Sequence, residues 1–567
     1  MSRDFLFELG TEELPSGSVF PLAEALAERM QAGLTEARLT YGNVYAFSTP
    51  RRLAVLIHDV QLEQTSHHVE RLGPREDAGF QSDGTSSKAL LGFARSCGVG
   101  VDDLVLIDTP KGRRFAYHAM TPPVPTAQIL PDIVYDAVMG LPITKPMRWG
   151  CGSQAFARPV HWAMLLFGED IIQLELFGCV THNLSFGHRY HHPEAIKINT
   201  PKAYEGLLRE ASVMVDFKAR RDAIIASIHQ VLLPIDAEAV MPEALLNEVT
   251  SIVEWPTALL VKFESRFLDI PSEVLIESMQ SHQKCFAVRK RSGALLPYFV
   301  TVSNIKSSSP EHVIQGNERV MKARLSDAEF FFAEDRKQSL DDRIKATENV
   351  IFQAKLGSLR DKAARMEVIM NYLVEPLALD PHDASRAARL SKCDLLTGMV
   401  GEFPELQGTM GYYYAQIDGE TPAVAAALKE QYLPRFASDD LPHAPLGLAL
   451  SIADRMDTLV GTFAIGLKPT GENDPFKLRR HALAVVRLLG ALPTSVGLRS
   501  LLNAARCAYG TQFLSDETLV STVQQFILDR LPAFYQTVDH AVELVHATLA
   551  KQSDCLRDLN TRIVALS

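Results

Sequence analysis

The stretch that divides this chain reads Asn304-Ile305-Lys306-Ser307-Ser308-Ser309-Pro310-Glu311-His312-Val313-Ile314-Gln315-Gly316. Before it, many apolar residues recur at every second position, as they do in strands. After it, apolar residues recur at steps of three and four, as they do in amphipathic helices. The serine run and Pro310 interrupt any regular element that precedes them. The sequence therefore predicts a mixed helix-and-strand part up to about residue 310, followed by a helical part.

Towards the N-terminus the pattern predicts a layered α/β module. One apolar set has period two and ends at Gly10; it consists of Phe5, Phe7 and Leu9. A second set has helical spacing and consists of Ala23, Leu26, Met30 and Leu34. Further predicted strands cover residues 44–47, 53–57, 163–167, 171–177 and 259–263, and a short helix covers 89–97.

Towards the C-terminus the clearest helical stripe consists of Leu359, Ala363, Met366, Ile369 and Leu373. Residues 376–383 mark a second, weaker boundary. The fold class predicted is multidomain α+β, with α/β and α+β modules before an all-helical domain. The predicted division is 1–65 (α/β module), 66–140 (small α+β module), 141–310 (α+β module), 311–375 (helical connector) and 376–567 (helical domain).

Composition excludes several classes of protein. The 567 residues are 47% hydrophobic and 22% charged, which is typical of globular domains and not of disordered chains. No apolar run is long enough to cross a bilayer, and the N-terminus lacks a signal-peptide layout, so we expect a soluble, cytoplasmic protein. Seven scattered cysteines, including Cys151, show no zinc-like spacing and indicate reduced thiols.

A basic stretch stands out against a net charge of −11: residues 468–506 contain seven basic and two acidic residues. Asp474-Pro475 is typical of a helix start, so a helix is predicted from about residue 475. Lys477, Arg479 and Arg480 would then lie in its first two turns, where the helix dipole disfavours cations. An external phosphate would compensate, since free N–H groups and arginine side chains both bind it. The alternative is a solvated face, or arginines paired with distant carboxylates.

Two further segments allow anion contacts. Residues 141–162 contain Lys145, Arg148, Arg158 and His161 between aromatic residues, with no acid. Trp149 and Trp162 could stack on unpaired bases, or they could be core residues with the cations at the rim. The histidines of 187–192 do not have the spacing of a helical zinc site, so a loop that makes hydrogen bonds or binds phosphate is the preferred interpretation.

The helical part contains a pattern similar to that of HD-type phosphohydrolases, in which histidines and aspartates hold a divalent metal. The order is His382, then Lys392-Cys393-Asp394, then Asp454. The histidine that should precede Asp394 is missing, and a charged lysine cannot bind a metal. The chain also lacks a Walker loop, a dinucleotide-binding glycine pattern, a nucleophile elbow and a His-Glu-x-x-His motif. We therefore expect no metal site and no complete reaction from this chain alone.

The motifs occur together, in order, in one family. They are Phe7 to Pro15, Ser48 to Leu53, Met147 to Gly150, Gly187 to Arg189, Val253 to Pro256, Gly316 to Phe332, Leu356 to Lys362 and Asp474 to Arg480. Over nearly its whole length the chain resembles the beta subunit of the bacterial heterotetrameric glycyl-tRNA synthetase. The resemblance implies modules similar to parts of the phenylalanyl-tRNA synthetase beta chain, within 141–310, and a degenerate HD-like domain.

The resemblance also implies the function: this glycine–tRNA ligase subunit binds and positions tRNA(Gly) for ATP-dependent glycylation at the active site of a separate alpha subunit, in an α2β2 complex. No catalytic residue and no cofactor is expected in this chain, and ATP and Mg²⁺ are expected at the alpha subunit. Neither DNA nor a membrane is an expected partner. Family members continue into an anticodon-binding domain, and Ser567 lies before the position expected for it.

Basic residues within the motifs and the basic stretch are the predicted tRNA contacts. They are Lys468, Lys477, Arg479 and Arg480 first, then Arg51, Arg52, Arg148 and Arg189. Two other functions remain open from the sequence: an HD-type metal-dependent phosphohydrolase, and a noncatalytic RNA-binding scaffold.

Overall fold

The computed structural model describes residues 1–65, 67–81, 85–110, 112–121, 123–150, 152–471, 473–513, 516–538, 540–551 and 553–567. Cys151, Glu472 and the predicted boundary at residue 66 lie outside these residues. The chain forms two compact units. The first comprises Met1–Val261, Lys284–Ala294 and Tyr298–Asn317, and the second comprises Lys262–Gln283, Leu295–Pro297 and Glu318–Ser567. The multidomain α+β class is confirmed, with 51% helix and 19% strand, while the five-part division stays a prediction.

A five-stranded sheet is the centre of the first unit. Its order is β2-β3-β1-β7-β8, and every pairing is antiparallel. The strands are β1 (Ser2–Thr11), β2 (Val44–Thr49), β3 (Arg52–Gln61), β7 (Val160–Phe167) and β8 (Asp170–Ile171). Gly10 of β1 lies opposite Arg52 on one side and Trp162 on the other. A Cβ at Gly10 would lie 1.9 Å from Trp162 Cε2, so only glycine leaves room for this ring.

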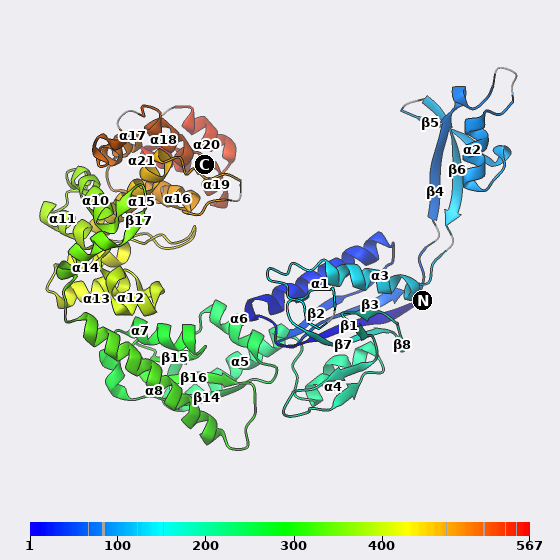
Figure 1. Cartoon of the computed structure of the whole chain (residues 1–567), viewed down its shortest axis with the longest axis horizontal. Coiled ribbons are helices and arrows are strands. Elements are labelled where there is room, and N and C mark those ends of the chain that lie inside the picture. The colour runs from blue at the N-terminus through cyan, green and yellow to red at the C-terminus, as the bar shows by residue number, and fades with distance from the viewer. Residues whose placement is uncertain are drawn as a thin grey trace. The chain divides into compact units, whose positions relative to one another are not determined.

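Both faces of this sheet are buried, because alternate side chains point to opposite faces. Phe5, Phe7 and Leu9 pack with α1 (Ser16–Glu36) and α3 (Thr126–Met139). Leu6 packs on the opposite face with residues of α4 (Tyr204–Glu210). Figure 1 shows α1 and α3 on one side of the sheet and α4 on the other. The sequence predicted the first face; the second is shorter along β1 because Glu8 occupies the next position on it.

Smaller sheets and helices make up the rest of the first unit, except that Lys262 of β14 and Leu295–Pro297 of β16 belong to the second. One sheet, in the order β4-β6-β5, consists of β4 (His67–Arg75), β6 (Gly112–Thr121) and β5 (Val105–Thr109), with α2 (Lys88–Cys97) in contact with β4. A second has the order β13-β15-β16-β14, from β13 (Ala237–Ala239), β15 (Phe286–Lys290), β16 (Leu295–Ser303) and β14 (Thr257–Lys262). Two ladders pair β9 (Glu175–Leu176) with β10 (Cys179–Val180), and β11 (Leu184–Phe186) with β12 (Ala195–Lys197). The remaining helices are α5 (Phe217–Leu232) and α6 (Glu243–Ile252).

The predicted strand over residues 171–177 is wrong, because β8 ends at Ile171 and β9 begins only at Glu175. The Thr181 hydroxyl accepts a hydrogen bond from the backbone N–H of Leu174 at 2.8 Å and donates one to the carbonyl of Ile172 at 2.6 Å. The Thr181 side chain therefore occupies backbone N–H and carbonyl groups that a continuous strand would use to pair with its neighbour.

The second unit is helical, as predicted. Its short elements are α7 (Ser272–Glu277), α9 (Leu340–Arg343), α12 (Gly398–Glu402) and the ladder of β17 (Ile351–Gln353) with β18 (Gly357–Ser358). The longer helices are α10 (Leu359–Val374), α11 (Pro381–Leu390), α13 (Thr409–Ile417), α14 (Pro422–Glu430), α15 (Pro445–Ala464), α16 (Leu478–Gly490), α17 (Leu498–Cys507), α18 (Leu519–Leu528), α19 (Leu531–Thr537), α20 (Val542–Leu549) and α21 (Leu556–Leu566). Helix α8 (Pro310–Asp335) begins at Pro310, and its residues from Glu318 onward belong to the second unit.

Helix α15 is the core of this unit. Every residue from Leu446 to Phe463 is buried, and the helix packs against α10, α14, α16, α17 and α18. A helix surrounded in this way is buried on all faces, so the charged residues it carries must find partners inside the protein. Among the described residues, no helix has both the length and the apolar character needed to cross a bilayer.

Candidate nucleic-acid interface

The basic stretch forms the start of α16, three residues later than predicted. The helix begins at Leu478, and Lys477 precedes it in the left-handed conformation, with φ 55°. Asp474 caps the helix as predicted: its carboxylate accepts from the N–H groups of Leu478 at 2.8 Å and Arg479 at 3.0 Å. Two of the free helical N–H groups are therefore already bonded, and an external anion would have to be bound mainly by side chains.

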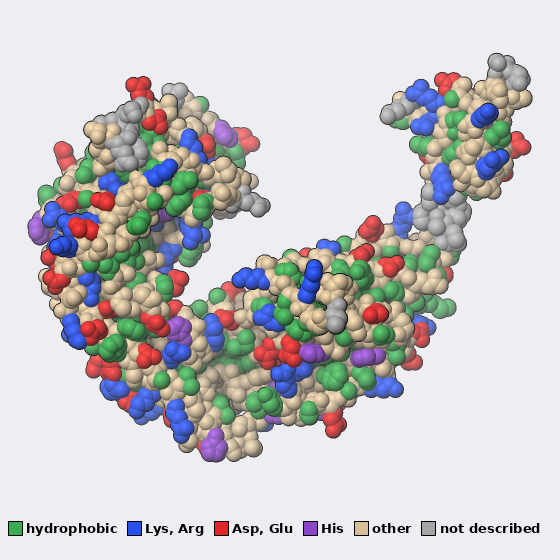
Figure 2. All heavy atoms as spheres, viewed as in Figure 1, with side chains coloured by type: hydrophobic (Ala, Val, Ile, Leu, Met, Phe, Trp, Pro, Cys, Tyr) green, Lys and Arg blue, Asp and Glu red, His purple; other side chains and the backbone are tan. Residues whose placement is uncertain are grey.

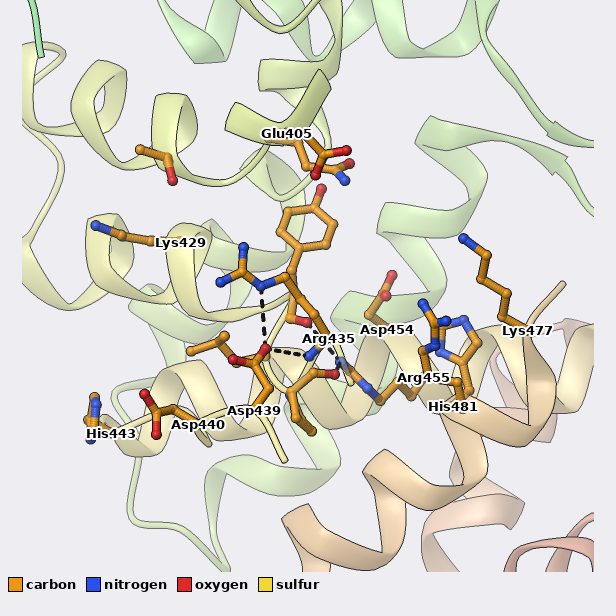
Figure 3. A pocket seen from close by; sticks show the side chains of 16 residues that line it. Glu405, Lys429, Arg435, Asp439, Asp440, His443, Asp454, Arg455, Lys477 and His481 are labelled. Carbon is orange, nitrogen blue, oxygen red and sulfur yellow. Dashed lines mark hydrogen bonds and ion pairs between the residues drawn. The ribbon is translucent and has the colours of Figure 1, made fainter. Parts of the chain in front are cut away.

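A cavity of about 590 Å³ lies beside the start of α16 in the second unit. Lys477 and Arg480 line it, together with His481 of α16 and Arg455 of α15. Figure 3 shows Lys477, His481 and Arg455 gathered at one end of this cavity. Among the described residues, the side chains of Lys477 and Arg480 make no hydrogen bond or ion pair, and both are exposed. The structure thus brings two of the predicted contacts together and adds Arg455 and His481.

Two basic groups at this end of the cavity, His481 and Arg455, differ in charge at pH 7. Burial lowers the pKa of His481 to about 4, and the charge of Arg455 contributes to this shift. The imidazole is therefore neutral at pH 7. Burial also lowers the pKa of Arg455 to about 10, against the opposing effect of Asp454, so this guanidinium remains charged.

A buried cluster of lysine and aspartate side chains lies next to Arg455. Asp454 Oδ1 is 3.2 Å from Lys362 Nζ and 3.0 Å from Lys392 Nζ. Lys362 also binds Asp457 at 3.0 Å, and Asp457 binds Arg365 Nε at 2.5 Å. Burial alone would raise the pKa of Asp454, but the two ammonium groups outweigh it and hold the pKa well below its ordinary range.

These residues do not fit a divalent metal. In the pattern predicted from His382, Asp394 and Asp454, the last carboxylate would have to bind the ion, yet two lysines already hold it. His382 has a side chain 87% exposed, whereas Asp394 and Asp454 are buried. Burial raises the pKa of Asp394 to about 6, and its Oδ2 accepts from the N–H of Gly408.

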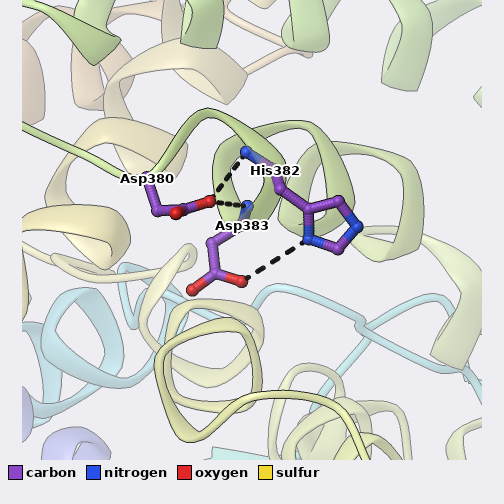
Figure 4. A group of neighbouring side chains, drawn as sticks. All are labelled: Asp380, His382 and Asp383. Carbon is purple, nitrogen blue, oxygen red and sulfur yellow. Dashed lines mark hydrogen bonds and ion pairs between the residues drawn. The ribbon is translucent and has the colours of Figure 1, made fainter.

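His382 belongs to a different, exposed group, shown in Figure 4 with Asp380 and Asp383. The Asp380 carboxylate accepts from the backbone N–H groups of His382 at 2.8 Å and Asp383 at 3.0 Å. It is the N-cap of α11, and we assign the group to helix capping.

A second predicted contact, Arg52, is fully buried in the first unit. Its guanidinium lies 3.6 Å from Glu8 and 3.3 Å from Glu254, and it also donates to the carbonyl of Phe186 at 2.8 Å. Burial alone would lower the pKa of Arg52, but Glu254 and Glu8 outweigh it and raise the pKa. Tyr204 and Trp162 both donate hydrogen bonds to Glu8. Because no part of Arg52 reaches the surface, its role in this structure is to join the sheet to the segments that follow it.

Two other predicted contacts in the first unit, Arg189 and Arg51, already interact with neighbouring side chains. Arg189 binds Glu12 at 3.0 Å, and Glu12 also binds His161 at 3.0 Å. Arg51 is half-buried, with its guanidinium carbon 5.8 Å from the centroid of Trp162. Trp162 is a core residue, so the core alternative holds for it and the stacking alternative does not. His188, in the histidine segment, is buried and accepts through Nδ1 from the N–H of Tyr190 at 3.2 Å, as the loop interpretation predicted.

The remaining predicted contacts lie at the surface. Lys468 is exposed, with Nζ 5.9 Å from the centroid of Phe463, and Arg148 is exposed. The Arg479 guanidinium donates to the carbonyl of Gly471 at 2.6 Å. Figure 2 shows lysine and arginine side chains interspersed with acidic ones on the visible face of the second unit, so no single basic surface dominates this view.

The sequence predicted neither Arg455 nor His481 as part of this site. Arg455 directly follows Asp454 of the HD-like pattern, and His481 directly follows Arg480, the last residue of the Asp474 to Arg480 motif. The sequence signal that could have identified Arg455 is its place next to Asp454 of the HD-like pattern.

Comparison with known proteins agrees with this arrangement of motifs. The family model described as Glycyl-tRNA synthetase beta subunit matches residues 5–550. Proteins named glycine–tRNA ligase beta subunit are similar to this chain over all of its length and 82% of theirs: 46% identical in Chromohalobacter salexigens, 43% in Pseudomonas syringae pv. tomato and 42% in Coxiella burnetii. A match of this extent and identity establishes the family. The chain therefore belongs to the glycyl-tRNA synthetase beta subunit family.

Proposed function

We propose that this chain binds tRNA(Gly) and positions it for ATP-dependent glycylation at the active site of a separate alpha subunit. The assembly proposed is α2β2, in the cytoplasm, with ATP and Mg²⁺ used by the alpha subunit. The observation that carries this proposal is the family match over residues 5–550, with relatives that are named as a ligase subunit.

The distribution of free cations supports the proposal. Lys477 and Arg480 are exposed and without ion-pair partners among the described residues, and Lys468 and Arg148 are exposed as well. Exposed cations of this kind can displace counterions from RNA phosphates, which supplies most of the nonspecific affinity for nucleic acids. We therefore place Lys477 and Arg480 first among the proposed tRNA contacts and exclude buried Arg52 from them.

The proposed mechanism is positional. Binding energy collected on this chain would hold the acceptor end of the tRNA beside the adenylate of the alpha subunit. Attack by a terminal ribose hydroxyl then becomes effectively intramolecular, and orientation of this kind can lower a barrier by several kcal/mol, roughly 7 to 11 at most. Residues of this chain change the rate without touching the reacting atoms.

The test is the salt dependence of tRNA binding to the complex of this chain with its alpha partner. In the Lys477→Ala/Arg480→Ala variant, the affinity should fall and the slope of log K against log salt should become less steep by about 1 to 2. A slope identical to that of the unmodified complex would contradict the proposed contacts.

The two other functions inferred from the sequence have less support. A metal-dependent phosphohydrolase would need Asp454 as a ligand, and Lys362 and Lys392 hold that carboxylate. A noncatalytic RNA-binding scaffold would bind tRNA equally well and differs only in whether the alpha partner yields glycine-dependent charging.

A further inference from the structure

The cavity beside α16 is lined in part by cations that form no ion pair among the described residues. Its free cations are Lys477 and Arg480, described above. Arg455 is 4% exposed, and its Nη1 and Nη2 groups already donate hydrogen bonds of 2.7 to 3.1 Å to four neighbouring residues: Gln431, Ser451, Tyr432 and Pro434. Its buried Nε finds no acceptor among the residues that the structure describes. A buried guanidinium with an unused donor in a cavity wall favours an anionic ligand.

The acidic residues of the cavity do not cancel this charge. Asp454 is held by Lys362 and Lys392, and Asp439 accepts from the backbone N–H of Arg435 at 2.7 Å and from its Nε at 3.3 Å. The other acidic lining residues, Glu405 and Asp440, are exposed. Figure 3 shows Asp440 and His443 at the end of the cavity away from Lys477. Among the described residues, no carboxylate forms an ion pair with Arg455, Lys477 or Arg480, so the end of the cavity at Lys477 keeps a positive charge.

The remaining lining suits the sugar and base of a nucleotide. Tyr432, Leu433 and Pro434 provide aromatic and apolar surface, and neutral His481 can donate or accept one hydrogen bond. A volume of about 590 Å³ lies within the range of roughly 300 to 1,000 Å³ that is usual for pockets holding small organic ligands. A cavity of this kind accepts a nucleotide that is splayed out of a single strand, as RNA-binding proteins commonly require, and not a duplex.

We propose that this cavity binds one nucleoside monophosphate group through Lys477, Arg480 and Arg455, without a metal ion. The group is either an unpaired nucleotide of an RNA or a free nucleotide, and only the first source rests on the proposed tRNA-binding function. No bond is made or broken: the phosphate stays on the nucleoside, and binding positions it.

The first experiment measures binding of AMP and of a 5′-phosphorylated RNA trinucleotide to the full chain by isothermal titration calorimetry, at about 150 mM salt with EDTA present. At this ionic strength, contacts between distant exposed charges are largely screened. Saturable one-to-one binding is expected, with adenosine at least about 10-fold weaker than AMP, since the phosphate supplies the charge-assisted bonds.

Variants test the assignment to the cavity. The Lys477→Ala/Arg480→Ala variant should weaken both ligands by at least about 10-fold. The control Lys345→Ala/Arg499→Ala removes the same charge from exposed residues that do not line the cavity, and it should change binding less than about 2-fold. Equal weakening in the two variants, or no saturable binding of AMP and the trinucleotide, would overturn the proposal.

Competition with tRNA identifies the source of the nucleotide. If AMP displaces tRNA from the complex with the alpha partner, the cavity takes a nucleotide of the RNA; if AMP binds and tRNA stays, the cavity takes a free nucleotide. If tRNA binds with the expected salt slope while AMP and the trinucleotide do not bind at all, this inference fails and the proposed function stands.

Discussion

At the scale of single residues, the buried ion cluster of the first unit makes the sharpest prediction. Replacing Arg52 with methionine (Arg52→Met) leaves Glu8 and Glu254 buried without the guanidinium that lies between them, which should lower the free energy of unfolding by about 3 to 5 kcal/mol. Glu12→Gln breaks an exposed ion pair and should cost no more than about 1 kcal/mol. Urea unfolding of both variants measures the difference, and equal costs would show that Arg52 is not held as the structure has it.

His481 makes a prediction about pH. In the folded protein its pKa is about 4, below the ordinary value of 6.5, because of burial first and then the charge of Arg455. The unfolded chain therefore binds a proton between pH 6.5 and 4 that the folded chain does not, so stability falls as the pH falls through this window. His481→Gln should remove this contribution, at most about 3 kcal/mol, and flatten the dependence of unfolding free energy on pH. Parallel curves for the two proteins would contradict the assignment.

The burial of single charged residues is the property that could not be predicted from the sequence. Lys477 and Arg480 were predicted as tRNA contacts from local context alone, and both side chains are exposed. Arg52 was predicted in the same way, but its partner Glu254 lies 202 positions away in the chain. A single sequence does not reveal contacts at that separation, so burial could not be predicted. The same limit applies to Asp454, whose partner Lys362 lies on another helix.

At the scale of elements, the capping of α16 can be tested directly. Asp474→Ala removes the acceptor of two N–H groups and should destabilise the start of the helix by about 1 kcal/mol. Amide hydrogen exchange at Leu478 and Arg479 should become faster, whereas Asp474→Asn keeps an acceptor oxygen and should largely preserve protection. Unchanged exchange in the alanine variant would show that the cap contributes little.

Elements with strong periodicity were predicted correctly and those shaped by side-chain contacts were not. The strand β1 and the helices α1 and α10 follow the patterns read from the sequence, since each has one apolar side that packs on a core. Helix α16 starts at Leu478 and not at the predicted residue 475, because Asp474 caps it from four residues before the first helical residue. The strand predicted over residues 171–177 is wrong because the Thr181 hydroxyl forms hydrogen bonds with the backbone of this segment.

At the scale of the whole molecule, the protein has a net charge of −11 and a few cations that no carboxylate among the described residues neutralises. An acidic protein binds RNA selectively only where cations are free of carboxylates, and the described residues offer this at the start of α16. The family was predictable from motifs spread over the chain, and the match over residues 5–550 confirms it. The anion-binding cavity was not predictable, because its walls come from separate helices.

The most direct test of the central claim is a glycylation assay with three samples: this chain alone, the alpha partner alone, and the two together, each with tRNA(Gly), glycine and ATP. Only the mixture should attach glycine to tRNA, at least about 100-fold faster than either sample alone, because one polypeptide holds the RNA and the other performs the chemistry. If the chain alone charges tRNA, or if the alpha partner alone charges it as fast as the mixture does, the account is contradicted.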